Sequence, residues 1–162
     1  MSERQTPIRP TDDEARARAR QLLVEARHGA LAVLDPDTGF PHVTRVAVGH
    51  DGAAALVLVS TLSHHTQALL SDPRCSLLVG EPGPKGDPLT HARLTLQARA
   101  TRADKAALRL SWLAAHPKTT LYYDFTDFLL LRLDPQGAHL NGGFGRAFRL
   151  TPEDLAPMSG AA

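Results

Sequence analysis

Tight turns between short β-rich runs constrain the fold of this chain more than any other feature. The runs 30–34 and 40–48 flank the sequence DPDTG at 35–39, whose residues are typical of a β-turn. A second turn, HDG at 50–52, leads into the apolar run 53–60. Connections this short join antiparallel strands, because parallel strands need a longer crossover. The sequence therefore predicts three consecutive antiparallel strands in its first half.

The second half continues the β pattern. Residues 75–80 read as a strand, and the Pro- and Gly-rich segment 81–88 must be a loop. A long run at 89–102 then alternates in the manner of a strand. The side expected to face the core carries Thr90, Ala92, Leu94, Leu96 and Ala98. The side expected to face a cleft or a second subunit carries Leu89, His91, Arg93, Thr95 and Gln97.

A last hairpin is predicted near the end of the chain, turning at DPQG, residues 134–137. The glycine-rich segment GGFGRAF at 142–148 reads as a tight turn and a strand rather than a phosphate loop, because it opens no helix. Six or so strands joined mainly by hairpins, with helices inserted, predict an α+β domain built on an antiparallel barrel or sheet.

Three helices are predicted around these strands. The first begins at Thr11, which forms a capping box with Glu14, and it ends at Gly29. Its apolar face carries Ala15, Ala19, Leu22, Leu23 and Ala26. The second follows the hydroxyl-rich segment after residue 60 and stops at Asp72-Pro73. The third begins near Thr101 and ends before Pro117, with Trp112 expected in packing.

Composition fits one ordinary domain: 162 residues, 43% hydrophobic and 22% charged. We predict a loose arm at 1–10, a folded domain at 11–155 and a short tail at 156–162. A net charge of +1 gives no reason to expect a nucleic-acid or membrane partner. The N-terminus has no apolar signal core, so we expect a cytoplasmic protein by default. The single Cys75 excludes an internal disulfide and is expected to be buried and inert.

The stretch at 60–66 is the strongest candidate for a functional site. It carries Ser60, Thr61, Ser63, His64, His65 and Thr66. Adjacent histidines on a helix point about 100° apart, and no cysteine or acidic residue sits at ligand spacing, which disfavours a metal site. A helix start offers unpaired N–H groups and a partial positive charge, so an anion site fits better. Simple capping by Ser63 is the alternative, but it needs only one of these residues.

Two arginines lie within apolar strands. Arg45 is in HVTRVAV at 42–48, and Arg93 begins RLTLQARATR at 93–102. An arginine in such a strand must reach solvent or find an anion. Both could converge with the hydroxyl-rich helix start on one phosphate. The dinucleotide and P-loop motifs GxGxxG and GxxxxGK[ST] are both missing from the chain.

The order of these segments resembles the FMN-binding split β-barrel superfamily of pyridoxamine 5'-phosphate oxidase-like proteins. The segments that carry the resemblance are GALAVLDPDTGFPHVTRVAV (29–48), LVLVSTLSHHTQALLSDPRCSLLV (56–79), RLTLQARATR (93–102) and DFLLLRLDPQGAHLNGGFGRAFRL (127–150). The branch it resembles most is that of the heme-utilisation proteins, which share the HT pair and the GFGRA segment.

The resemblance implies a six-stranded antiparallel split barrel with flanking helices. It also implies a homodimer with FMN in each interface cleft. FMN contacts would come from Arg45, Val46, Ala47, Ser60, Thr61, Ser63, His65, Thr66 and Arg93. Within the adjacent pair, His65 is expected to point into the phosphate site, where the phosphate would favour its protonated form. His64 is expected to face solvent with little to do.

The chain also departs from the oxidase pattern. Gly49 and His50 stand where the oxidases carry a lysine, and the C-terminal Arg-x-His that grips a vitamin B6 substrate is missing. Three functions stay open: an FMN-dependent oxidoreductase with an unidentified small-molecule substrate, a heme-binding or heme-degrading protein with His116 or His139 as a possible iron ligand, and a non-catalytic ligand-binding dimer. No catalytic acid or base can be named from the sequence.

Overall fold

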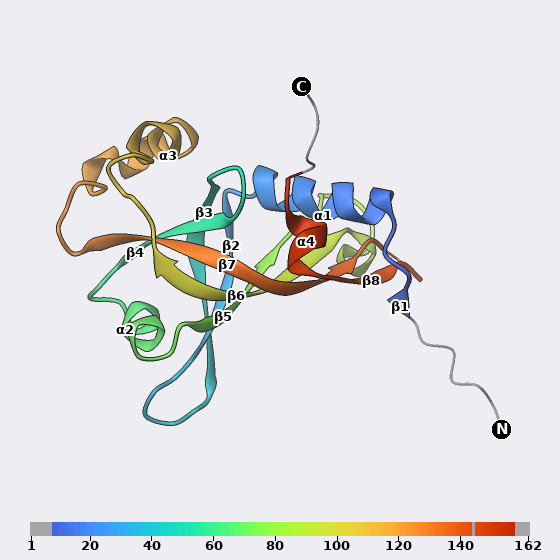
Figure 1. Ribbon diagram of the computed structural model, residues 1–162, viewed down its shortest axis with the longest axis horizontal. Helices are drawn as coiled ribbons and strands as arrows, with labels where there is room; N and C mark the ends of the chain where they lie inside the picture. The colour runs from blue at the N-terminus through green and yellow to red at the C-terminus, as the bar shows by residue number, and fades with distance from the viewer. Residues whose placement is uncertain (1–7, 144, 158–162) are drawn as a thin grey trace.

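A closed antiparallel barrel of six strands forms the centre of the computed structural model, which describes residues 8–143 and 145–157 (Figure 1). The barrel strands are β2 (His28–Leu34), β3 (Pro41–His50), β4 (Ala55–Ser60), β5 (Arg74–Val79), β6 (Arg93–Arg102) and β7 (Phe128–Asn141). They are ordered β7-β4-β3-β2-β5-β6, and pairing of β6 with β7 closes the ring. The predicted α+β split barrel is confirmed.

Two short strands extend the sheet beyond the ring. β8 (Ala147–Leu150) pairs antiparallel with β7, and β1 (Ile8–Arg9) pairs parallel with β8. The last residues of the predicted arm at 1–10 are thus part of the sheet, while residues 1–7 and 158–162 lie outside the described residues. The domain boundaries themselves stay predictions.

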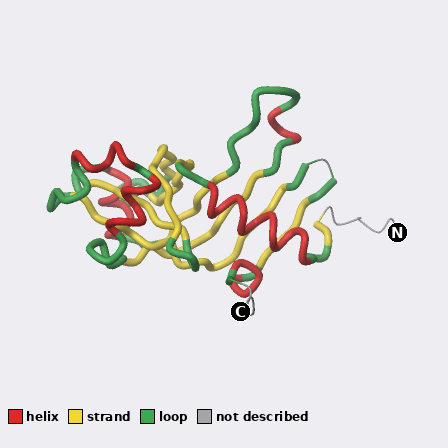
Figure 2. The backbone as a smooth tube through the Cα atoms, turned by 90° about the horizontal axis from the view of Figure 1, so that it is seen from above, coloured by secondary structure: helices red, strands yellow, loops and turns green. Residues whose placement is uncertain are grey.

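Helices cover the barrel from several sides (Figures 1 and 2). The described helices are α1 (Asp13–Glu25), α2 (His64–Ser71), α3 (Arg109–Ala115) and α4 (Pro152–Leu155), with 3₁₀ turns at Pro88–Thr90 and Pro117–Leu121. Figure 2 shows α1 lying across the strands. Within residues 8–143 and 145–157, none of the helices has the length and apolar character needed to cross a membrane.

Alternation along the strands gives the barrel two apolar faces. Inward residues such as Leu31, Val48 and Leu96 are fully buried and form one core with the apolar face of α1. Outward residues of β4 (Leu56, Leu58) and β7 (Leu130) form a second cluster with Trp112 of α3 and with Tyr123, which precedes β7. The expected packing role of Trp112 is confirmed, and its indole N–H donates to Thr119 Oγ1 at 3.1 Å.

The first helix differs from its prediction at both ends. Its N-cap is Asp12, whose carboxylate accepts from the Ala15 amide at 2.8 Å, so the predicted Thr11 capping box is wrong. The helix ends at Glu25, and Gly29 belongs to β2 instead of closing the helix. A Cβ at Gly29 would lie 2.7 Å from the Leu78 carbonyl oxygen, so this glycine serves close strand approach.

The predicted turn at 134–137 is also wrong. β7 runs through it without a break, and a register shift opposite Gln97 and Ala98 leaves Gln136 as an extra residue. A β-bulge accommodates Pro135, which has no N–H to give to the ladder. The true hairpin lies between β7 and β8, where the Gly142 amide donates to the Arg146 carbonyl at 2.7 Å.

The long strand and the third helix are both shorter than predicted. β6 begins at Arg93 because Pro88–Thr90 forms a 3₁₀ turn capped by Asp87. Thr101 lies within β6, and its hydroxyl donates to Asp134 Oδ2 at 2.7 Å across the β6–β7 pair rather than capping a helix. The predicted buried side of this strand is confirmed for Leu94, Leu96 and Ala98.

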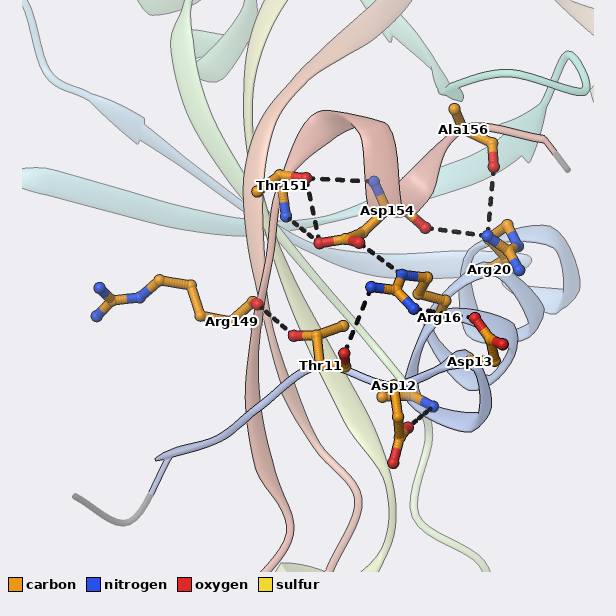
Figure 3. A network of polar contacts seen from close by, with 10 residues as sticks. Thr11, Asp12, Asp13, Arg16, Arg20, Arg149, Thr151, Asp154 and Ala156 are labelled. Carbon is orange, nitrogen blue, oxygen red and sulfur yellow. Dashed lines mark hydrogen bonds and ion pairs between the residues drawn. The ribbon is translucent and has the colours of Figure 1, made fainter. Parts of the chain in front are cut away.

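A polar clasp joins α1 to the C-terminal helix α4 (Figure 3). Arg16 Nε donates to Asp154 Oδ1 at 2.6 Å, and Arg20 donates to the Asp154 carbonyl at 3.0 Å. Thr151 and Asp154 cap α4 reciprocally. The Thr151 amide and the Arg16 guanidinium lower the pKa of Asp154. The clasp therefore depends on a charged Asp154.

We expect Asp154→Asn to lower the melting temperature at pH 7, because it removes this charge from the clasp. A carboxyl with a lowered folded pKa stabilises the fold above its unfolded pKa of about 4, and that contribution disappears as the pH falls through the folded value. The gap between variant and parent should thus narrow in acid. Asp13→Asn is the matched control, since Asp13 contacts the same arginine but is fully exposed. Thermal melts from pH 3 to 7 test this, and a pH-independent gap would contradict it.

Candidate functional site

Arg45 lies on the outer face of β3. Its neighbour Val46 is 7% exposed and points into the barrel, so successive side chains place Arg45 outside. Arg45 pairs in register with Ala30 of β2 and lines a cavity of about 180 Å³ that also contains His28 and Leu78. Among the described residues, no hydrogen bond or ion pair to the Arg45 guanidinium is found. It is therefore available to an anionic ligand.

Ser60 is the last residue of β4. β3 and β4 pair antiparallel from His50 opposite Ala55 to Ala47 opposite Leu58, so the pairing ends two residues before it would set Ser60 opposite Arg45. Ala47 packs against the outer cluster under α3, whereas Val46 belongs to the inner core. Of the three consecutive residues predicted to approach FMN, Arg45 and Ala47 thus face outward and Val46 does not.

The start of α2 leaves backbone donors free. Ser63 occupies the N-cap position, but its side chain makes no capping hydrogen bond. Among the described residues, the amides of His64 and His65 have no acceptor, while Thr66 and Gln67 donate to the Ser63 carbonyl. Two free amides with the positive end of a helix dipole can hold an anion. The alternative, in which the Ser63 side chain caps the helix, is not observed, although Ser63 is the N-cap residue. The anion site stays a prediction.

Two hydroxyls of this stretch are constrained, one by a carboxylate and one by burial. Ser60 Oγ donates to Asp127 Oδ2 at 2.9 Å, and the Thr61 amide donates to the Asp127 carbonyl at 2.7 Å. Thr66 is completely buried, and its hydroxyl has no partner among the described residues. Its predicted phosphate contact would require the α2 start to open.

The paired histidines differ in role, as predicted, but not in the predicted way. His64 Nε2 lies 2.7 Å from Asp35 Oδ2, and the ring meets that of His42 edge-on at 4.9 Å. The expectation that His64 does little is therefore wrong. The Thr38 amide and then His64 lower the pKa of Asp35 to about 2. The pair ties the β2–β3 turn to the start of α2.

His65 is half-buried. Burial lowers its pKa, and the nearby His42 and His64 lower it further. A neutral imidazole is therefore the form at neutral pH, which opposes the predicted protonated His65 unless a bound anion restores the charge. Although the three histidines are close, the described residues contain no group of three His, Cys, Asp or Glu side chains placed to hold a metal ion.

Arg93 is not brought to this site. It lies on β6, three strands from β3 in either direction around the barrel, and donates to the Leu89 carbonyl at 2.9 Å. The predicted convergence of both arginines on one phosphate does not occur within the chain. His116 is tied to the Val48 carbonyl at 2.8 Å and stacks on Trp112, whereas His139 is exposed on β7.

His28 is the cavity residue that the sequence reasoning missed. It opens β2 next to Arg45, its side chain is 49% exposed, and Nδ1 lies 3.9 Å from Glu81 Oε2. The sequence pattern places His28 in the last turn of the first helix, because Gly29 is predicted to close that helix, and so gives it no role in a site. A β2 start at residue 28 is the signal that would have revealed it.

Gly49 explains one departure from the oxidase pattern. A Cβ at this position would lie 2.8 Å from the ring of Trp112. Trp112 of α3 therefore fills the space into which a longer side chain at 49 would extend.

We expect Gly49→Ala to lower the free energy of unfolding by about 1–3 kcal/mol, because overpacking a filled core forces neighbours to move. Gly39→Ala provides a contrast: no atom lies within 4 Å of its Cβ position, so only its positive φ opposes the change. Urea unfolding with tryptophan fluorescence measures both. An unchanged stability of Gly49→Ala would mean that α3 adjusts freely.

Comparison with known proteins gives consistent matches. A family model described as pyridoxamine 5'-phosphate oxidase matches residues 15–141. A curated protein of Arabidopsis thaliana, named non-canonical heme oxygenase HOZ, chloroplastic, is 36% identical over 116 residues, which is 68% of this chain and 34% of the relative. The chain thus spans about a third of that relative's length.

Two solved structures share 34% identity with the chain. One is a heme binding protein from Mycobacterium smegmatis, with a TM-score of 0.81 over 91% of this chain and 61% of that one. The other is Atu2129 from Agrobacterium tumefaciens, a protein of unknown function, with a TM-score of 0.78 over 93% of this chain and 64% of that one.

Proposed function

Because this chain belongs to the pyridoxamine 5'-phosphate oxidase family, we propose that it binds heme on the outer face of its split barrel, beside Arg45. The observation that carries this proposal is the cavity in which Arg45, without an ion pair among the described residues, and His28 lie together. A guanidinium suits a heme carboxylate, and an imidazole suits heme iron. The names of the relatives from Arabidopsis thaliana and Mycobacterium smegmatis support the same ligand.

The residues that line the cavity are suited to contact part of a heme molecule. Ala30 and Leu78 give it an apolar floor, and Glu81 lies close enough to His28 to influence the orientation of the imidazole. Bound heme would supply an iron centre that can bind and activate oxygen. The protein's own residues would anchor the carboxylates and exclude water from the apolar floor. Heme degradation, which the Arabidopsis relative's name describes, is the enzymatic form of this proposal.

A second candidate is FMN, as an oxidoreductase cofactor acting on a small-molecule substrate. The free amides of His64 and His65 favour it, because a phosphate is the group that such a helix start holds best. The carboxylate of Asp127 weighs against it at the same place. A non-catalytic ligand-binding protein on this fold is the third reading, and it predicts binding without turnover.

We propose a homodimer in which a second copy covers the outer face of β2, β3 and β5. This face exposes Val43 at 61% and Leu78 at 42%, with Ala30 and Ala32 between them. Contiguous apolar side chains of this kind are typical of an interface. The cavity at Arg45 borders the same face, so a partner would help to enclose a bound cofactor.

We expect hemin titration to produce a Soret band, and Arg45→Ala to weaken the binding about 10- to 100-fold, because a charge-assisted hydrogen bond contributes about 1.5–3 kcal/mol. His28→Ala should shift the Soret maximum. Arg99→Ala, a change at another exposed strand arginine, is the control. FMN titrated in parallel tests the second candidate. If neither hemin nor FMN binds, only the third reading remains, that of a non-catalytic protein with a different ligand.

We expect Val43→Arg to convert a dimer into a monomer in light scattering at micromolar concentration, because it places two like charges in the proposed interface. Leu110→Arg, at a side chain that is 80% exposed on α3, should leave the mass unchanged. A monomer mass for the unaltered protein would rule out the dimer.

A further inference from the structure

The start of α2 combines groups that attract an anion with groups that repel one. The free amides of His64 and His65 attract it. Two carboxylates contact side chains of this segment: Asp127 accepts from Ser60 Oγ, and Asp35 is paired with His64. One hydroxyl, that of Ser60, and one imidazole, that of His64, are therefore already engaged by carboxylates.

We infer that Asp127 is a specificity-determining residue that makes this helix start select against a dianionic phosphate. The inference rests on the second candidate of the proposed function, because it concerns the helix start at which an FMN phosphate would bind. A helix N-terminus contributes the equivalent of about half a positive charge. The Asp127 carboxylate, which accepts from Ser60 Oγ just before this helix, opposes that attraction for a phosphate.

Two contacts hold Asp127 next to the segment that leads into α2. Its backbone carbonyl accepts from the Thr61 amide at 2.7 Å, and the next residue, Phe128, pairs in register with Ser60. The carboxylate is thus fixed at the end of β4, on the side of the chain that leads into α2. An asparagine there can keep the hydrogen bond from Ser60 through its carbonyl oxygen while presenting N–H donors in place of a charge.

The test compares FMN with riboflavin, which differ only by the phosphate. Flavin fluorescence quenching measures both affinities in the parent, in Asp127→Asn and in Asp124→Asn. Asp124 lies in the same loop but pairs with Arg109 at 2.7 Å, so its removal is a matched control. We expect Asp127→Asn to raise FMN affinity about tenfold relative to riboflavin and Asp124→Asn to leave the ratio unchanged. A tenfold change corresponds to about 1.4 kcal/mol.

Several outcomes overturn the inference. Equal gains for both flavins would show that Asp127 acts on the ring site rather than on phosphate. An unchanged or lower ratio, or no FMN binding by Asp127→Asn at millimolar concentration, would show that the carboxylate does not exclude phosphate. Asp35→Asn, which removes the second carboxylate, should move the ratio in the same direction and guards against misfolding of the first variant.

Hemin titration of the same proteins keeps this inference separate from the proposed function. If Asp127→Asn binds hemin like the parent and gains FMN, both stand. If the parent gives no Soret band but the flavin ratio rises, the heme proposal fails while the role of Asp127 is supported.

Discussion

Closure of the barrel by the β6–β7 pair is the constraint on which the rest of the structure depends. Once the ring is closed, every strand has an inner and an outer side, and the two apolar clusters follow from that division. The inner side is filled by strand residues and α1. The outer side is covered by α3 over β4 and β7, but it stays open where β2, β3 and β5 face outward. The candidate site lies at the border between the covered and open parts, because Arg45 is two residues before the covered Ala47 and on the same side of β3.

Much of this arrangement could be predicted from the sequence because hairpin turns are local. The turns at 35–39 and 50–52 lie between strands that are adjacent in the barrel, and their residues carry the signal themselves. The segment 134–137 is also rich in turn residues, but it forms a β-bulge within β7. That bulge depends on pairing with β6, which is distant in sequence. The helix predicted to begin at Thr101 is wrong for the same kind of reason, since its hydroxyl donates to Asp134 on a neighbouring strand instead of accepting from an amide three residues ahead.

The site was predictable as a set of residue types and less so as an arrangement. Hydroxyls and histidines at 60–66 do mark the start of a helix, whereas the cavity that Arg45 lines is formed by residues of β2, β5 and the segment after β5. What the sequence could not reveal is which donors are already used. The partners of Ser60 and His64 are Asp127 and Asp35, which are 67 and 29 residues away. The predicted convergence of Arg93 with Arg45 does not occur within the chain for a topological reason. The spacing of arginines along the sequence does not show that β3 and β6 lie on opposite sides of the closed barrel.

The clasp between α1 and α4 has a consequence for synthesis on the ribosome. Arg16 and Asp154 are 138 residues apart, and β1 likewise waits for β8. At about 5–20 residues per second, the first helix would wait on the order of ten seconds for its last partner to emerge. During that interval its apolar face has no complete docking surface. The nascent chain therefore exposes the apolar face of this amphipathic segment long before the finished protein buries it.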